Sequence, residues 1–280
     1  MTETIDNVFR VVAETAGDVR NVLSERRSYE SAENPSGEQQ LAADVYADEL
    51  LEEGLLDLDG VGSYASEERE SLVDDDGALH VACDPLDGSS NLQSNNAMGT
   101  IVGIYEERPP APGDTLVAAG YVLYGPITTM VTAVGGTVTE YLIEEGTYQV
   151  LEENCTLPSD PTVYGFGGRV PDWTPAFRSY VDSVESERLK LRYGGAMVAD
   201  VNQVLTYGGI FGYPMLEDRP EGKLRLQFEG QPIAYILSAA GGASTDGHQS
   251  LLSKTPDSLH ERSPVFVGSE DLIADLETSL

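Results

Sequence analysis

Two carboxylates stand three residues apart in a short segment rich in small side chains, Asp84-Pro85-Leu86-Asp87-Gly88-Ser89-Ser90-Asn91. The apolar run 78–83 before it is typical of a buried strand, which we expect Pro85 and Gly88 to end. Carboxylates select a hard cation such as Mg²⁺, and a turn of small residues cradles a phosphate, more strongly where a helix begins. The segment therefore predicts a metal-assisted phosphate site. The alternative is an ordinary Asp-Gly turn with capping serines.

Further acids could converge on this segment. The apolar spacing after Leu41 predicts a helix, on which Asp44 and Asp48 share one face and Glu49 lies one step around. Glu67 and Glu68 end the segment 63–68, which follows a Gly-rich linker. In a chain this acidic, a solvated helix face and a surface Glu-Glu pair are the simpler interpretations. The sequence leaves both alternatives open.

Cationic residues are scarce, and two of them lie close together. The only lysines are Lys190, Lys223 and Lys254. Polar and apolar residues alternate over 223–228, which predicts a strand that projects Lys223 and Arg225 to the same side and ends at Glu229. Lysine and arginine are natural phosphate ligands. A solvated strand edge is the alternative for this pair.

The charge of the chain excludes several classes of partner. Asp and Glu number 48 and Lys and Arg 16, a formal net charge of −32 over 280 residues, so the chain should repel nucleic acid and anionic membranes. No apolar run approaches the roughly 20 residues of a membrane span, and residues 1–10 lack a secretory signal. Two cysteines, Cys83 and Cys155, are too few for a disulfide framework and favour a reduced, cytoplasmic setting. The acidity indicates a surface adapted to concentrated salt, which screens its self-repulsion.

Periodic apolar positions predict most of the remaining elements. We expect helices over 4–23, 175–187, 197–206, 231–240 and 271–280. We expect consecutive antiparallel strands over 99–105, 116–124, 127–134 and 138–143, and later strands over 163–166, 208–213 and 264–267. Ser36 and Gln39 form a candidate capping box before the second helix. The proline-containing run 152–161 is the candidate boundary between domains 1–157 and 158–280.

From residue 34 to its end the chain resembles class I fructose-1,6-bisphosphatases. The matching segments are 37–50, 66–68, 84–91, 99–105, 116–125, 192–200, 208–214, 222–229 and 232–235. The 84–91 motif is shared with the wider lithium-sensitive phosphatase superfamily, including inositol monophosphatases, whereas 192–200 and 208–229 are more specific to the fructose-bisphosphatase branch. Phe228-Glu229 stands where the inositol branch usually carries Trp-Asp. The resemblance implies an α/β sugar phosphatase fold. Two sheet-containing halves would form a layered α-β-α-β-α sandwich, with most metal ligands in the N-terminal half and the sugar-binding residues in the C-terminal half.

The resemblance also implies an activity, the Mg²⁺-dependent hydrolysis of the 1-phosphate of fructose 1,6-bisphosphate in gluconeogenesis. Two or three Mg²⁺ ions, which Mn²⁺ could replace, would be held by Glu67, Asp84, Asp87, Glu229 and the Leu86 carbonyl. The implied catalytic residues are Glu68 and Glu49, which help to deprotonate the attacking water, and Asp44 beside the outermost metal. The implied substrate ligands are Gly88, Ser89 and Ser90 for the cleaved phosphate, and Tyr193, Met197, Tyr213, Lys223 and Arg225 for the sugar and its distal phosphate. Arg192 matches a residue that reaches the neighbouring subunit's site, which implies a homo-oligomer, dimer or tetramer.

The chain departs from the family pattern in two places. The run 164–169 lacks the Asn and Tyr that often contact the distal phosphate, and Arg169 is the candidate replacement. Ala78 and Leu79 stand where AMP-inhibited members carry Lys-Tyr, so we expect weak or absent inhibition by AMP. Two alternative functions stay open: a broader inositol-phosphate or sedoheptulose-bisphosphate phosphatase, and a non-catalytic protein that binds metal or a phosphosugar.

Overall fold

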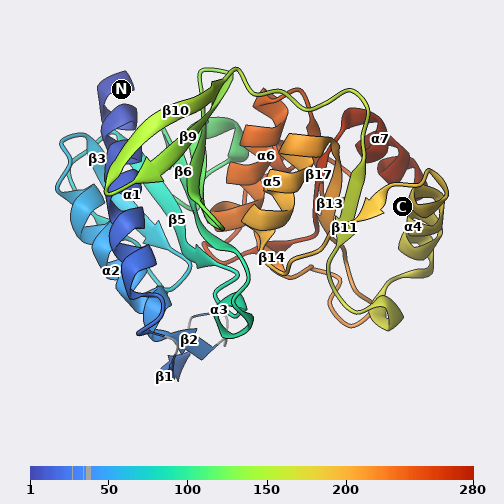
Figure 1. Cartoon of the computed structure of the whole chain (residues 1–280), viewed down its shortest axis with the longest axis horizontal. Helices are drawn as coiled ribbons and strands as arrows, with labels where there is room; N and C mark the ends of the chain where they lie inside the picture. The colour runs from blue at the N-terminus through green and yellow to red at the C-terminus, as the bar shows by residue number, and fades with distance from the viewer. Residues whose placement is uncertain (27, 34, 36–38) are drawn as a thin grey trace.

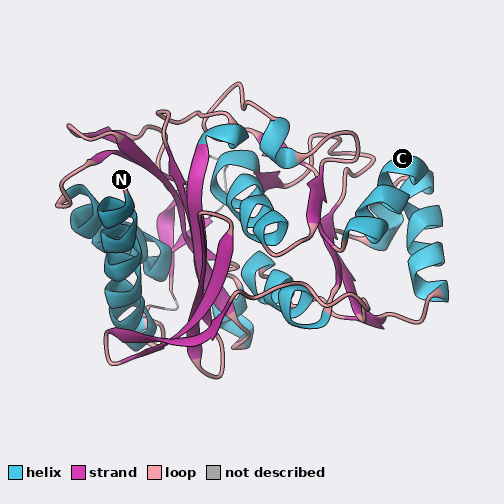
Figure 2. Cartoon of the chain, turned by 90° about the horizontal axis from the view of Figure 1, so that it is seen from above, coloured by secondary structure: helices cyan, strands magenta, loops and turns pink. Residues whose placement is uncertain are grey.

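Helices and sheets alternate in five layers in the computed structural model, which describes residues 1–26, 28–33, 35 and 39–280 (Figures 1 and 2). The first layer holds helices α1 (Thr2–Val22) and α2 (Ala42–Leu56). An eight-stranded sheet follows, and α5 (Met197–Tyr207) and α6 (Gln231–Ala239) form the central layer. A five-stranded sheet and then α4 (Pro175–Ser186) and α7 (Glu270–Ser279) complete the stack. The predicted α-β-α-β-α sandwich with two sheet-containing halves is confirmed.

The larger sheet has the order β10-β9-β8-β7-β6-β5-β3-β4. Its strands are β3 (Val61–Ser66), β4 (Val73–Asp74), β5 (Leu79–Asp87), β6 (Met98–Tyr105), β7 (Leu116–Tyr124), β8 (Thr128–Val134), β9 (Thr137–Glu144) and β10 (Thr147–Glu153). From β6 to β9 the strands form the predicted antiparallel succession, which β10 extends, while β3 and β5 are parallel. The sequence did not predict β10, because its seven side chains are all exposed and show no half-buried alternation.

The smaller sheet has the order β12-β11-β13-β17-β15 and mixes parallel and antiparallel pairs. Its strands are β11 (Val163–Phe166), β12 (Lys190–Leu191), β13 (Gly209–Tyr213), β15 (Ala243–Thr245) and β17 (Val265–Gly268). Two short pairs lie outside both sheets: β1 (Tyr29–Glu33) with β2 (Gln39–Leu41), and β14 (Leu224–Arg225) with β16 (Arg262–Ser263). Short helical turns are α3 (Asn91–Ser94), 113–115, 170–172 and 251–253.

Three hydrophobic cores hold the layers together. The first lies between α1, α2 and the larger sheet and includes Val8 and Leu51. The central core packs α5 and α6 between the sheets, with Ile233 completely buried. In the outer core the Phe177 ring of α4 lies 5.6 Å from the Phe266 ring of β17, centroid to centroid. Burial of these apolar side chains fixes the two halves against each other and so fixes the cleft between them.

Strand β5 does not end where we predicted. It continues through Pro85 to Asp87, and only Gly88, with φ +71°, turns the chain. Pairing with β6 is irregular between Asp84 and Asp87, so Pro85 needs no ladder N–H at that point, and its carbonyl accepts a 2.9 Å hydrogen bond from the Thr100 hydroxyl. The Gly-rich linker that we expected before Ser63 was wrong for residues 61 and 62, because the buried strand β3 begins at Val61.

The predicted strand 223–228 was wrong beyond Arg225. A π-helix over Leu226–Gly230 follows β14 and leads into α6. The backbone N–H of Arg225 donates to the Glu229 carboxylate at 2.6 Å, so the chain coils back instead of continuing the strand. Ser36 of the candidate capping box lies outside the described residues, and α2 begins only at Ala42.

The division into domains 1–157 and 158–280 stays a prediction. No helix in the described part of the chain is both long enough and apolar enough to cross a membrane.

Candidate active site

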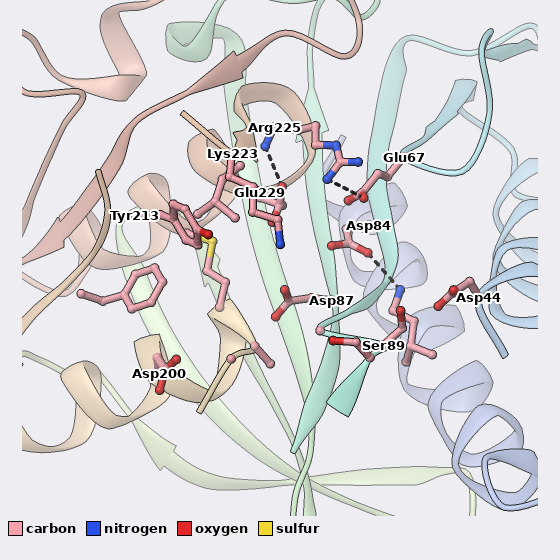
Figure 3. Close-up of a pocket in the computed structure, with 18 of the residues that line it drawn as sticks. Asp44, Glu67, Asp84, Asp87, Ser89, Asp200, Tyr213, Lys223, Arg225 and Glu229 are labelled. Carbon is pink, nitrogen blue, oxygen red and sulfur yellow. Dashed lines mark hydrogen bonds and ion pairs between the residues drawn. The ribbon is translucent and has the colours of Figure 1, made fainter. Parts of the chain in front are cut away.

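Carboxylates from three separate elements meet in the cleft between the two halves (Figure 3). Glu67 follows β3, Asp84 lies in β5, and Glu229 lies in the π-helix. One carboxylate oxygen from each lies within 4.8 Å of the others, and the three side chains are 7%, 4% and 3% exposed. Three buried acids this close repel one another strongly unless a cation or protons compensate them.

The parallel pairing of two strands places two of these acids together. Ser66 of β3 is paired in register with Cys83 of the parallel strand β5. Glu67 directly follows Ser66 and Asp84 directly follows Cys83, so the two acids lie side by side at the same edge of the sheet. The backbone N–H of Glu67 donates to the Cys83 carbonyl at 3.0 Å and extends the pairing. Asp84 accepts a 3.0 Å hydrogen bond from the backbone N–H of Leu86. The thiol of Cys83 is completely buried, as expected for a structural cysteine.

Burial and repulsion between neighbouring carboxylates raise the pKa values of two of the clustered acids, Asp84 and Glu229. Desolvation, followed by the charge of Glu67, raises the pKa of Asp84 well above its usual range and that of Glu229 to about 8. Desolvation also raises the pKa of Asp87 to about 7, although the Val198 N–H donates to its carboxylate at 2.8 Å and opposes the rise. A hard divalent cation would reverse these effects, and oxygen donors are the ligands that such a cation prefers. The donor set therefore fits a metal ion.

One arginine compensates part of this negative charge. Arg225 is 3% exposed, and its Nη1 lies 3.0 Å from Glu67 Oε1. Its backbone N–H is bonded to Glu229, so a single residue contacts two of the three clustered acids (Figure 3). Lys223 lines the same cavity, in agreement with the prediction that the two cations project to one side.

The turn after Asp87 lies directly against the other half of the molecule. A Cβ on Gly88 would meet the Ala196 Cβ at 2.3 Å. The Asn91 side chain, one turn further on, donates to the Gly194 carbonyl at 2.9 Å. Ser89 and Ser90 line the cavity at the start of the short helix α3. The turn thus presents hydroxyl and backbone N–H groups beside the clustered acids.

The far side of the cavity, which encloses about 390 Å³, comes from the C-terminal half. Tyr193, Met197 and Tyr213, which the family resemblance implies as substrate ligands, line it. Asp200 lines it too, although the sequence did not single it out as a site residue. Its carboxylate is 3% exposed and accepts the Gly194 N–H at 2.7 Å, and desolvation raises its pKa to about 6. Its position three residues after Met197, on the same face of α5, was the available signal.

The structure settles the placement of the other predicted site residues. Asp44 and Glu68 line the cavity, whereas Glu49 is exposed and lies outside its lining. The simpler interpretation of a solvated helix face was wrong for Asp44 and Asp48, which are both buried. Asp48 accepts a 3.0 Å hydrogen bond from Tyr64 and pairs with Arg69, so its role is structural.

The Glu67–Glu68 pair and Arg192 are the remaining predicted site residues. The surface interpretation of the Glu67–Glu68 pair was wrong for Glu67, which is buried, while Glu68 is half-buried. Arg192 is exposed and does not line the cavity of its own chain.

Two family models together match almost the whole chain. The model of the fructose-1-6-bisphosphatase N-terminal domain matches residues 4–153, and that of the C-terminal domain matches residues 157–280. A fructose-1,6-bisphosphatase class 1 of Natronomonas pharaonis is 69% identical, with 100% of both chains covered. A second one, of Haloarcula marismortui, is 58% identical over 99% of this chain and 95% of its own.

Solved structures agree with these relatives. The fructose-1,6-bisphosphatase of Leishmania major in holo form superimposes with a TM-score of 0.93 at 27% identity, covering 99% of this chain and 94% of that chain. Its apo form superimposes with a TM-score of 0.88 at 26% identity, covering 100% and 94%. Sequence motifs, family models and fold thus agree, and the chain belongs to the fructose-1,6-bisphosphatase family.

Proposed function

We propose that this protein hydrolyses the 1-phosphate of fructose 1,6-bisphosphate, giving fructose 6-phosphate and inorganic phosphate. The observation that carries the proposal is the convergence of three buried carboxylates, Glu67, Asp84 and Glu229, next to the Gly88–Ser90 turn. The names of the curated relatives support the same activity. Gluconeogenesis, in the cytoplasm, is the setting that we propose for it.

In this proposal the three clustered acids hold the metal, with Asp87 and the Leu86 carbonyl as further ligands, and two or three Mg²⁺ ions bind per subunit. Mn²⁺ would substitute because it prefers the same oxygen donors. A bound divalent cation would lower the pKa of a coordinated water and offset the charge of the phosphate. The buried, otherwise self-repelling donors support this assignment.

The residues of the turn and the remaining acids would act on the cleaved phosphate. Gly88, Ser89 and Ser90 would orient it through backbone N–H groups and hydroxyls. Glu68 and Asp44 line the cavity and would accept a proton from the attacking water. Because Glu49 is exposed outside the lining, the structure favours Glu68 and Asp44 over Glu49 for this role.

The C-terminal half would hold the rest of the substrate. Tyr193, Met197 and Tyr213 would pack on the sugar, and Lys223 and Arg225 would supply positive charge for phosphate. The exposed position of Arg192 suits a role in the site of a neighbouring subunit. We accordingly propose a homo-oligomer, either a dimer or a tetramer.

Phosphate release in Mg²⁺ and in EDTA tests the proposal. We expect fructose 1,6-bisphosphate to be hydrolysed only with Mg²⁺, and with a higher kcat/KM than sedoheptulose 1,7-bisphosphate or inositol 1-phosphate. Asp84→Asn should abolish release, while the exposed control Asp59→Asn should behave as the parent. Substrate binding without release in Mg²⁺ would instead identify a non-catalytic phosphosugar-binding protein. A preference for inositol 1-phosphate would support the broader phosphatase.

A further inference from the structure

The π-helix that carries Glu229 is bonded to three polar side chains buried beside the central core. They are Tyr105 of β6, Gln227 and Gln231, and all three are completely buried. We call them the Tyr–Gln network. Burial of a polar group costs free energy unless the group is hydrogen-bonded, and the neighbouring core is mainly apolar. The presence of the network here therefore needs a reason other than hydrophobic packing.

Each polar atom of the Tyr–Gln network has a partner. Gln227 Oε1 accepts from the Ala111 N–H at 2.7 Å, and Gln227 Nε2 donates to Gln231 Oε1 at 3.2 Å. Gln231 Nε2 donates to the Lys254 carbonyl at 3.0 Å. The Tyr105 hydroxyl lies 3.1 Å from the Gln227 carbonyl oxygen and 3.2 Å from Gln231 Oε1. A buried network whose members are paired in this way makes its surroundings rigid.

The sequence explains why the π-helix needs an outside hydrogen-bond donor. In a π-helix the carbonyl of residue i accepts from the N–H of residue i+5, as the Leu226 carbonyl does from Gln231. The next carbonyl, that of Gln227, would accept from residue 232, which is a proline and has no N–H. The Tyr105 hydroxyl can donate to this carbonyl instead. A strand of the larger sheet thus supports the π-helix at the point where its own backbone cannot.

The glutamines connect the π-helix to two loops that lie outside the lining of the cavity. Residues 111–113, between β6 and β7, are bonded to Gln227 through Ala111. The Gly113 N–H donates at 2.9 Å to the Lys254 carbonyl, which also accepts from Gln231. A Cβ on Gly113 would lie 2.8 Å from Gln231 Nε2, so this loop packs directly on the amide. Both loops therefore hold the backbone on either side of Glu229 in the chain.

The Glu229 carboxylate must be held in place because it lies among like charges. One of its oxygens is within 4.8 Å of carboxylate oxygens of Glu67 and Asp84, and all three residues are buried. Repulsion between the three acids favours their separation. Amide and phenol groups are neutral, so they can hold this backbone without changing the charge that the cluster offers to a cation.

We propose that the Tyr–Gln network positions Glu229, because it fixes the π-helix so that this carboxylate meets those of Glu67 and Asp84. This inference rests on the proposed function, in which the three acids hold the metal. The network side chains lie outside the lining of the cavity, so they act through the backbone of the π-helix and not by contact with substrate. Groups that orient ligands in this way typically change metal affinity 10- to 100-fold when they are removed.

Tyr105→Phe and a matched control test the proposal without metal or turnover. The control is Tyr180→Phe, since the buried Tyr180 hydroxyl also donates to a backbone carbonyl, that of Leu272 in the outer layer, at 2.8 Å. Hydrogen exchange at the Arg225 amide, measured in EDTA, reports the bond from this N–H to Glu229. We expect exchange at Arg225 to be about tenfold faster in Tyr105→Phe than in Tyr180→Phe, the effect of losing one hydrogen bond.

Metal binding and kinetics distinguish positioning from a simple loss of stability. In Tyr105→Phe the dissociation constant for Mg²⁺, measured by titration calorimetry, should rise about tenfold. The KM for fructose 1,6-bisphosphate at saturating Mg²⁺ should stay that of the parent, because the network does not contact substrate. Tyr180→Phe should match the parent in both measurements. Gln227→Leu removes the amide that bonds to Ala111 and should raise the Mg²⁺ dissociation constant at least as much as Tyr105→Phe.

Two results would overturn the proposal: equal exchange at Arg225 in Tyr105→Phe and Tyr180→Phe, or an Mg²⁺ affinity of Tyr105→Phe equal to that of the parent. If Gln227→Leu does not fold, Tyr105→Phe alone decides, because it removes a single hydroxyl. If the parent bound no Mg²⁺ and released no phosphate, the proposed function would fail. The exchange measurement would still decide whether the network holds Glu229.

Discussion

The contact between Gly88 and Ala196 allows a sharp test of how the two halves build one site. In Gly88→Ala the new Cβ would lie 2.3 Å from the Ala196 Cβ and 2.8 Å from its Cα, whereas carbon atoms in contact normally lie about 3.5–4.0 Å apart. The turn or the segment before α5 must therefore move by more than about 1 Å. The turn also keeps φ at +71°, a conformation that alanine adopts only at a cost.

These two costs have separate magnitudes. The left-handed backbone conformation costs alanine about 1–2 kcal/mol, and overpacking against Ala196 costs about 1–3 kcal/mol more. At roughly 2 °C per kcal/mol for a chain of this size, the sum lowers Tm by about 4–10 °C. Displacing the turn by about 1 Å from the clustered acids should lower kcat/KM on fructose 1,6-bisphosphate about 100-fold.

Gly146→Ala is the matched control. Gly146 has φ +74° in the turn between β9 and β10, and a Cβ there would meet nothing within 4 Å. This control bears the backbone cost without the clash, so Tm should fall by only about 2–4 °C and kcat/KM should not change. Thermal melts and phosphate-release assays on both variants measure the difference. Equal Tm losses and equal activities would refute the argument that contact with Ala196 positions the turn.

Three further predictions concern charge. If the net charge of −32 destabilises the fold by self-repulsion, Tm should rise across a KCl series, and a Tm indifferent to KCl would contradict this. The pKa of Asp200 is raised to about 6 from 3.8, so between these values the folded state binds more protons than the unfolded state. The free energy of unfolding should therefore fall by roughly 3 kcal/mol as pH rises from about 4 to 7. Asp200→Asn should remove that part of the slope in urea melts, and an unchanged slope would argue against it. Arg225→Met leaves the Glu67 carboxylate buried without this partner and should cost about 3–5 kcal/mol in EDTA. The cost should be smaller in Mg²⁺, and equal urea midpoints of variant and parent in EDTA would contradict the prediction.

The sequence predicted those elements whose burial follows one simple period. Helix α5 and strands β7 and β11 lie within a residue of their predicted bounds. The apolar positions of α5 face one core, and those of each strand face the two cores on either side of its sheet. The sequence did not predict the π-helix, because this helix depends on a hydrogen bond from the Arg225 N–H to the Glu229 side chain that the pattern of polar and apolar residues does not reveal. Period-two alternation persists in the sequence there although the chain coils.

In the site, too, residues that are neighbours in the chain could be predicted, whereas residues brought together only by the fold could not. The 84–91 motif located a turn and two acids that line the cavity, since those residues are neighbours in the chain. Burial of Asp44 and Asp48 could not be predicted, because nothing local distinguishes them from the many solvated acids of this chain. Arg219 lines a cavity together with Arg169 because its turn is bonded through Leu216 to the loop that follows β11, a contact with no signature in the sequence.

Calorimetric titration with Mg²⁺ tests most directly whether Glu67, Asp84 and Glu229 form a metal site. The variant E67Q/D84N/E229Q is compared with E3Q/D18N/E277Q, in which three exposed acids are replaced and the net charge changes equally. At a fixed KCl concentration, saturable Mg²⁺ binding should persist in the parent and in the surface variant and disappear in the cluster variant. Saturable binding of the same affinity in all three proteins would contradict the account.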